Sequence, residues 1–105
     1  MADPTIKPFD AQGHTAKITA QHMTRRGVYW DALLYRDGHH IGNATNDGNG
    51  GQTKVDIPGV IDANRWRTAA ALNHQYTGTA EPHAVLAEIL VNIADGFAPS
   101  PHPHQ

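Results

Sequence analysis

The stretch that decides the fold of this chain is residues 27–58, which read GVYWDALLYRDGHHIGNATNDGNGGQTKVDIP. Side chains in 28–36 alternate between an apolar set and a mixed set, namely Val28, Trp30, Ala32 and Leu34 against Tyr29, Asp31, Leu33 and Tyr35. Such alternation predicts a strand with one buried face. Asp37-Gly38 follows, and because both residue types tolerate positive φ, the pair predicts a hairpin turn into a strand at 39–45.

Two registers fit this hairpin. A two-residue turn pairs Arg36 with His39, whereas a three-residue loop with a bulge pairs Tyr35 with His39 and sets Ala44 beside Trp30. We favour the second register, because a small residue suits the neighbourhood of a large indole. A slip of one residue would reverse the face of every side chain.

Strand patterns continue on both sides of the hairpin. Residues 14–24 alternate, and one predicted face of this strand holds Ala16, Ile18, Ala20 and His22. After the glycine-rich loop, residues 53–57 predict a short strand that Pro58-Gly59 ends.

Helical patterns fill the C-terminal part. Residues 62–75 carry a moderate apolar stripe, with Asp62 as the expected N-cap, and residues 81–95 carry a strong i, i+3/i+4 stripe. The chain therefore predicts an α+β fold, an antiparallel β-meander of about four strands with two C-terminal helices packed on one face. We expect an irregular lead-in over 1–13, a single domain over 14–97 and a disordered tail over 98–105.

Composition excludes several classes of protein. The chain has 105 residues, no cysteine and a net charge of −2, so a disulfide framework, a thiolate metal site and a strongly basic nucleic-acid module are ruled out. All eight Lys and Arg and seven of the ten acids lie in residues 1–67. No apolar run approaches the roughly 20 residues of a membrane span, and the N-terminal residues lack the apolar region of a secretory signal. We expect a cytoplasmic protein with no membrane partner.

The glycine-rich loop is the least ordinary sequence in the chain, and it supplies the candidate binding residues Asn46, Asp47, Gly48, Asn49, Gly50 and Gly51. Glycines let backbone N–H groups approach an anion closely. However, their spacing matches neither a Walker loop nor a dinucleotide loop, and the calcium pattern fails where Pro58 stands in place of a bidentate Glu. A plain hairpin connection and a partner-binding loop both remain open.

Catalytic and metal-binding patterns are absent from the sequence. There is no cysteine nucleophile, Ser100 is the only serine, and the acids are scattered over strands and turns. His39 and His40 are adjacent on a strand, so their side chains point to opposite faces. We therefore expect neither an enzyme nor a bound metal or cofactor.

The mixed face of the central strand is the second candidate surface. It carries Tyr29, Leu33 and Tyr35, with Arg25 and Arg26 close by in the preceding turn. Tyrosines and cations on a sheet face are typical of single-stranded nucleic-acid readers, but Asp31 in the middle of the face argues against that use.

Residues 23–51, with the cadence R-x-G-V-x-W-x-A-x-L-x-x-D-G-x-x-I-G-x-A-x-N-D-G-x-G-G, resemble a loose group of small bacteriophage and prophage accessory proteins. The resemblance implies a product that acts in the cytoplasm of a bacterial host, as an inhibitor or anti-defence protein that binds a host protein. It assigns no role to particular residues.

The leading hypothesis from the sequence is thus a non-enzymatic binding protein with a host protein as partner. The alternatives are a small-molecule or nucleotide binder of the sponge-like kind, which would use the glycine loop, and an RNA- or ssDNA-binding sheet. A homodimer could form through an exposed edge strand, either 14–24 or 53–57.

Overall fold

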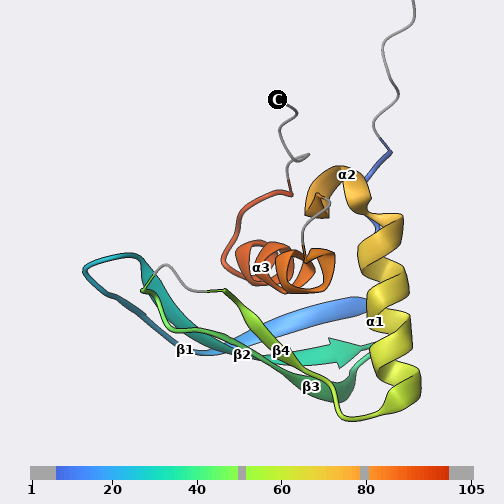
Figure 1. Ribbon diagram of the computed structural model, residues 1–105, viewed down its shortest axis with the longest axis horizontal. Coiled ribbons are helices and arrows are strands. Elements are labelled where there is room, and N and C mark those ends of the chain that lie inside the picture. Colours follow the sequence, from blue (N-terminus) through green and yellow to red (C-terminus); the bar gives the residue numbers. More distant parts are fainter. Residues whose placement is uncertain (1–6, 50–51, 79–80, 100–105) are drawn as a thin grey trace, which may run out of the picture.

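The computed structural model describes residues 7–49, 52–78 and 81–99. These residues form one antiparallel sheet in the order β1-β2-β3-β4, made of β1 (His14–Met23), β2 (Val28–Arg36), β3 (His39–Asn46) and β4 (Lys54–Asp56). Three helices follow, α1 (Val60–Leu72), α2 (His74–Thr77) and α3 (Pro82–Ala94). Figure 1 shows α3 crossing over one face of the sheet, with α1 standing at the end of the sheet. The predicted α+β fold is confirmed.

The core lies between this face and the helices. β2 turns Trp30, Ala32 and Leu34 inward, and their exposed fractions are 7%, 2% and 0%. The other core residues come from β3, α1 and α3, namely Ile41, Ala44, Trp66, Ala69, Ala70, Leu86, Ala87, Leu90 and Val91. Burial of each large apolar side chain contributes about 1.5–3 kcal/mol, so the helices are held on this face by the stripe that the sequence predicts for them.

The β2–β3 hairpin has a two-residue turn, with φ of 50° at Asp37 and 85° at Gly38. Arg36 pairs with His39 in this turn, so the three-residue loop that we favoured is wrong. The pairing then slips by one residue, and Ala44 lies opposite Ala32 instead of Trp30. The reason lies in spacing: Ile41 and Ala44 are both buried but stand three residues apart, which a strand can achieve only with a bulge.

β1 carries a second bulge at Thr19, between the pairs Ile18–Ala32 and Ala20–Asp31. The extra residue reverses the alternation, so that Ala20 and His22 leave the face that holds Ile18. The prediction that Ala20 and His22 share a face with Ala16 and Ile18 is therefore wrong. Gln21 turns inward instead, and its side-chain amide donates a hydrogen bond of 3.4 Å to Asp95 after α3.

The first predicted helix, 62–75, differs from the structure at both of its ends. α1 begins at Val60 with Gly59 as its N-cap, so Asp62 lies in the first turn and is not the cap that we predicted. The predicted helix 62–75 is divided at Asn73, whose side-chain amide donates to Ala69 O at 2.8 Å and so competes with the helical hydrogen bonds. α2 is a separate turn after it, and α3 agrees with the prediction of 81–95 within one residue.

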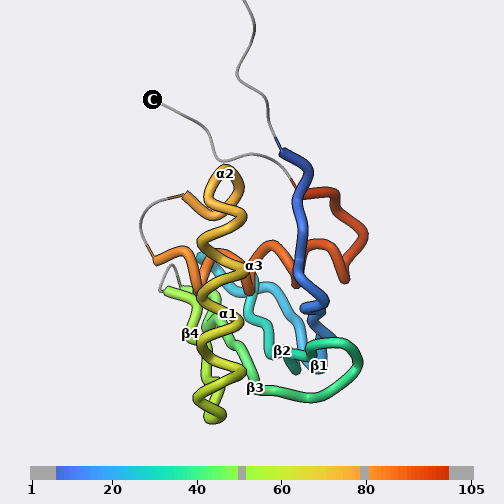
Figure 2. The backbone as a smooth tube through the Cα atoms, turned by 90° about the vertical axis from the view of Figure 1, so that its right-hand side faces the viewer, coloured from blue at the N-terminus to red at the C-terminus, as the bar shows by residue number. Residues whose placement is uncertain are grey.

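The lead-in has neither helix nor strand over residues 7–11, as predicted, but it is tied to the helices. Asp10 N donates to Asn73 Oδ1 at 2.9 Å, and the Asn73 amide returns a hydrogen bond of 2.5 Å to Asp10 O. Tyr76 OH donates to Lys7 O at 2.8 Å. Figure 2 shows this segment descending beside α1 toward β1. Most of the tail predicted to be disordered, residues 100–105, lies outside the described residues, as do residues 1–6.

Candidate functional site

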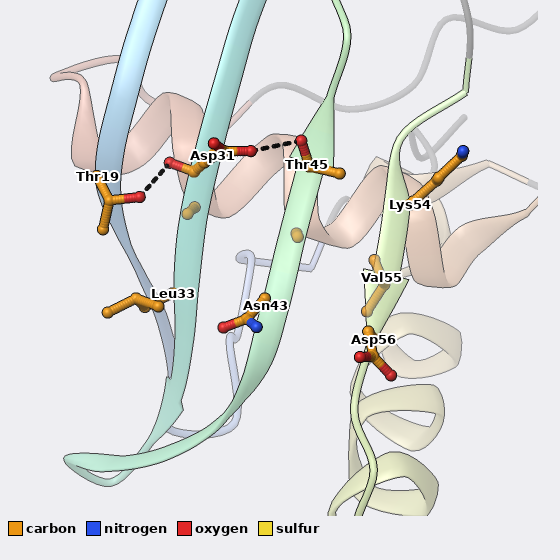
Figure 3. Close-up of a pocket in the computed structure, with 10 residues that line it drawn as sticks. Thr19, Asp31, Leu33, Asn43, Thr45, Lys54, Val55 and Asp56 are labelled. Carbon is orange, nitrogen blue, oxygen red and sulfur yellow. Dashed lines mark hydrogen bonds between the residues drawn. The ribbon is translucent and has the colours of Figure 1, made fainter.

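The face of the sheet turned away from α3 carries no helix in the described part of the chain (Figure 3). We call it the open face. Strand pairing arranges its side chains in two rows across the sheet, one made of Lys17, Leu33, Asn43 and Asp56, and the other of Ala20, Asp31, Thr45 and Lys54. A shallow groove of about 540 Å³ lies over these rows. Tyr29 and Tyr35 lie at its two ends on β2, and the four β2 side chains of this face are all half-buried.

Asp31 is the centre of a small hydrogen-bond network on the open face. Tyr29 OH donates to Asp31 Oδ2 at 2.5 Å, and the Thr45 hydroxyl lies 2.6 Å from Asp31 Oδ1 (Figure 3). The hydrogen bonds from Thr45 and Tyr29 stabilise the carboxylate and lower the pKa of Asp31 below its usual value. The same bond to Asp31 raises the pKa of Tyr29. The phenol is thereby held protonated and fixed in orientation.

This network favours a fixed surface over acid–base chemistry. A general acid or base works best with a pKa close to the operating pH. The pKa of Asp31 moves down and that of Tyr29 moves up, so both groups move away from neutrality. Asp31 consequently serves as a charged acceptor that positions Tyr29 and Thr45.

Two aromatic pairs lie at the ends of the open face. His22 stacks on Tyr29 with ring centroids 4.5 Å apart and an interplanar angle of 19°. Tyr35 lies 5.6 Å from the His40 ring at 49°. Sequence reasoning missed both histidines: His22 reaches this face only because of the bulge at Thr19. A bulge leaves no signal in the alternation of β1, because an apolar Ala20 is acceptable on either face.

Arg25 and Arg26 lie in the turn between β1 and β2, and both are exposed. Thr24 organises this turn: its hydroxyl accepts hydrogen bonds of 3.1 Å from both Arg26 N and Gly27 N. The fold places this turn at the Tyr29 end of β2, far from Tyr35, and Arg26 lines a hollow with Trp30, Glu88 and Asn92 on the side of the sheet that α3 covers. Of the predicted binding residues, the structure brings Arg26, Asn46 and Gly48 together at this turn, and Gly48 also lies against the backbone of Tyr29. Leu33 and Tyr35 lie farther along β2.

The described half of the glycine loop, residues 46–49, packs against this same turn. Gly48 is buried with φ of 76°, and a Cβ there would lie 2.7 Å from Tyr29 N. Thr24 Oγ1 donates to Gly48 O at 2.5 Å. Gly48 N donates to Asn46 Oδ1 at 2.8 Å, and Asn49 N donates to Asp47 Oδ1 at 2.9 Å. These two N–H groups are used within the loop and are not offered to an anion. Gly50 and Gly51 lie outside the described residues.

The described residues contain neither a candidate metal centre nor a candidate membrane-spanning helix. Over the described residues, no group of three or more His, Asp or Glu side chains could hold a metal ion. None of the helices within those residues is long and apolar enough to cross a membrane.

No protein-family model matches the chain, and neither a curated protein nor a solved structure gives a match.

Proposed function

We propose that this chain is a small non-enzymatic binding protein that docks onto another protein through its open face. The observation that carries the proposal is that a rigid four-stranded sheet buries one face under helices and leaves Tyr29, Leu33 and Tyr35 half-buried on the other. Aromatic and aliphatic side chains held rigidly at a surface are the anchors of protein interfaces. The Tyr29–Asp31 hydrogen bond reduces the side-chain entropy that Tyr29 would lose on binding.

The charges around the groove indicate the chemistry of the partner. Lys17 and Lys54 are exposed at the two sides of the open face, Asp56 is exposed on the same strand as Lys54, and Arg25 and Arg26 are exposed in the turn beyond one end of the face. Asp31 already accepts two hydrogen bonds. A complementary partner would place an apolar centre over Leu33 and carboxylates opposite Lys17 and Lys54, since complementary charge steers association and sets the orientation.

The resemblance of residues 23–51 to phage accessory proteins extends this proposal to the identity of the partner. The partner would be a bacterial host protein, and the chain would block it in the host cytoplasm as an inhibitor of the anti-defence type. A small rigid domain suits such a role, because blocking a host protein needs a docking surface and no chemistry of its own.

The proposal is tested by a matched pair of charge insertions. Leu33→Asp places a carboxylate in the open face, whereas Ile61→Asp makes the same kind of change at an exposed residue of α1, 69% exposed. The wild-type chain, tagged and passed through bacterial lysate, should recover one stoichiometric partner. Leu33→Asp should lose that partner and Ile61→Asp should retain it. Retention by Leu33→Asp, in a variant shown to be folded by its melting curve, would contradict docking through the open face.

A strand of RNA or ssDNA is the second candidate ligand of the same face. The observation that favours it is the combination of Tyr29 and Tyr35 with Lys17, Lys54 and the arginine turn. Such binding weakens steeply with salt, because each phosphate contact releases counterions. A labelled oligonucleotide titrated at two salt concentrations separates the candidates, since the protein interface that we propose has an apolar centre and loses less affinity.

Self-association through an edge strand is a weaker alternative. β1 is an edge of the sheet and has ten residues, but the bulge at Thr19 interrupts its hydrogen-bonding edge and Lys17 lies beside the bulge. Both features are devices that prevent edges from pairing. The other edge, β4, has only three residues.

A further inference from the structure

A second, separate pocket lies between the lead-in, the start of β1, the end of β2 and α1. Its volume is about 270 Å³, and it is lined by Gln12, His14, Arg36, Arg65, Thr68 and Ala69. None of these residues belongs to the open face. It is also richer in positive charge than the groove on the open face, because two of its six lining residues are arginines.

His14 is buried in the wall of this pocket with one nitrogen unpartnered. Its exposed fraction is 1%, and its ring stands edge-on to Trp66 at 5.1 Å. Nδ1 lies 2.9 Å from Ala11 O, and because a carbonyl only accepts, Nδ1 carries the proton. Nε2 has no hydrogen-bond partner. In the neutral ring Nε2 is therefore an unpartnered acceptor, and protonation of the ring turns it into an unpartnered donor.

The arginines that line the pocket keep unused donors. Arg36 Nε is buried and has no hydrogen-bond partner, although Arg36 Nη1 contacts Asp37 at 3.2 Å. Arg65 is exposed and makes no ion pair with any described residue. The Gln12 side-chain amide has two N–H groups, and one of them donates to Asp10 at 2.6 Å. The second N–H takes no part in that hydrogen bond. Unused donors and two guanidinium groups around one hollow are the chemistry of an oxyanion site.

We propose that this pocket binds a phosphate group, held between the guanidinium groups of Arg36 and Arg65, with His14 as a third donor when it is protonated. The assignment rests on the pocket, on the two arginines with the unpartnered buried Nε of Arg36, and on the buried His14 Nε2, which becomes a donor on protonation. Arginine forks match tetrahedral oxyanions well, because several N–H groups point in fixed directions. The phosphate could be free or could belong to a phosphorylated small molecule, and both would present the same group here.

Protonation of His14 is coupled to this site. Burial lowers the pKa of His14, and Arg36 lowers it further, while Ala11 O, Asp37 and Asp62 raise it. An anion between the arginines would offset the repulsion from Arg36 and favour the imidazolium, whose Nε2–H could then donate. Binding and protonation therefore strengthen each other, as reciprocal linkage requires.

The experiment is an NMR titration of the whole chain with inorganic phosphate, sulfate and acetate, at constant ionic strength set with sodium chloride. We expect saturable 1:1 binding of phosphate and sulfate, with shifts at the His14 ring and the Arg36 and Arg65 side chains, and no saturation with acetate. Sulfate keeps its charge through the titration of His14, so its affinity should rise as the pH falls through the pKa of His14. A nucleoside monophosphate that binds more tightly than phosphate would identify a phosphorylated small molecule as the ligand.

A pair of arginine variants on α1 supplies the control. Arg65→Gln should weaken binding by about tenfold or more, the effect of losing one charge-assisted hydrogen-bonding group. Arg67→Gln removes an exposed arginine that does not line this pocket, and it should leave the affinity unchanged. Equal weakening by both variants, or saturable binding of acetate as well, would overturn the proposal and indicate an adventitious ion only. The absence of saturable binding of phosphate and sulfate would also overturn it.

Discussion

The nine residues of β2 form two faces, and the two faces lie in different surroundings. On the inner face, Trp30, Ala32 and Leu34 are at most 7% exposed beneath the helices. On the outer face, Tyr29, Leu33 and Tyr35 stay half-buried with no helix above them. The inner face is fixed by packing, whereas the outer face is fixed by the hydrogen bonds of Asp31 and by stacking. Removing side chains from the two faces should therefore have different consequences, the first for stability and the second for binding.

The largest expected contrast comes from two adjacent leucines. Leu34→Ala should lower the free energy of unfolding by about 2–5 kcal/mol, because it removes a fully buried side chain and leaves a cavity. Leu33→Ala should cost less than about 1.5 kcal/mol, because its side chain is only half-buried. Urea denaturation of both variants measures the difference. Equal losses would mean that the outer face also belongs to the core, and the proposed docking surface would lose its basis.

The next contrast asks whether the glycine loop belongs to the fold or to the binding surface. Gly48→Ala should lower the free energy of unfolding by about 2–4 kcal/mol. Alanine is strained at the left-handed φ of this residue, and its Cβ would also lie 2.7 Å from Tyr29 N. Gly38→Ala has a similar φ, 85°, but nothing lies within 4 Å of its added Cβ, so strain alone costs about 1–2 kcal/mol. Thermal or urea unfolding separates these effects. If Gly48→Ala were no worse than Gly38→Ala, the packing of the loop would be unimportant for stability.

The sequence is sufficient to predict the fold because its patterns are local. Alternation along 28–36 defines β2, Asp37-Gly38 defines the turn, and the apolar stripe after Pro82 defines α3. The boundary error at the C-terminal end of α1 arises where a contact distant in the sequence adds to a local one. Asn73 ends α1 because it holds Asp10 of the lead-in, a partner 63 residues away that no helical pattern reveals.

The candidate surface is less predictable, because bulges decide which side chains share a face. The outer set of β2 follows directly from alternation. His22, by contrast, joins Tyr29 only through the bulge at Thr19, and the pairing of Tyr35 with His40 depends on a two-residue turn whose register we mispredicted. His14 gives no sign in the sequence that it is buried between a carbonyl and an indole.

The pH dependence of stability should separate His14 from Asp31. The pKa of His14 is lowered from 6.5 in the folded state, so the unfolded chain binds the proton first and stability falls as the pH drops through 6.5 toward the folded pKa. One proton gives a slope of at most about 1.4 kcal/mol per pH unit. The pKa of Asp31 is lowered from 3.8, so its contribution is present above 3.8 and lost as the pH falls below it.

Two variants show which residue is responsible for each pH window, and their stability is measured in buffers without phosphate or sulfate. His14→Asn keeps a donor near Ala11 O and should flatten the slope just below pH 6.5 while leaving the acid limb intact. Asp31→Asn should lower the stability by a constant amount above pH 3.8 and flatten the fall below that pH. Urea midpoints measured across the pH range test both assignments, and an unchanged slope below pH 6.5 in His14→Asn would assign that window to another histidine.

The smallest expected effect tests how the outer face is held. Tyr29→Phe removes the hydroxyl that donates to Asp31 Oδ2 but keeps the ring that stacks on His22. The pKa of Asp31 should rise toward its usual value yet stay lowered, because the hydrogen bond from Thr45 is the larger cause of its shift. A ¹³C titration of the Asp31 carboxyl measures this change, and Thr45→Val should raise the same pKa further. The reverse order would mean that Tyr29, and not Thr45, is the main stabiliser of the carboxylate.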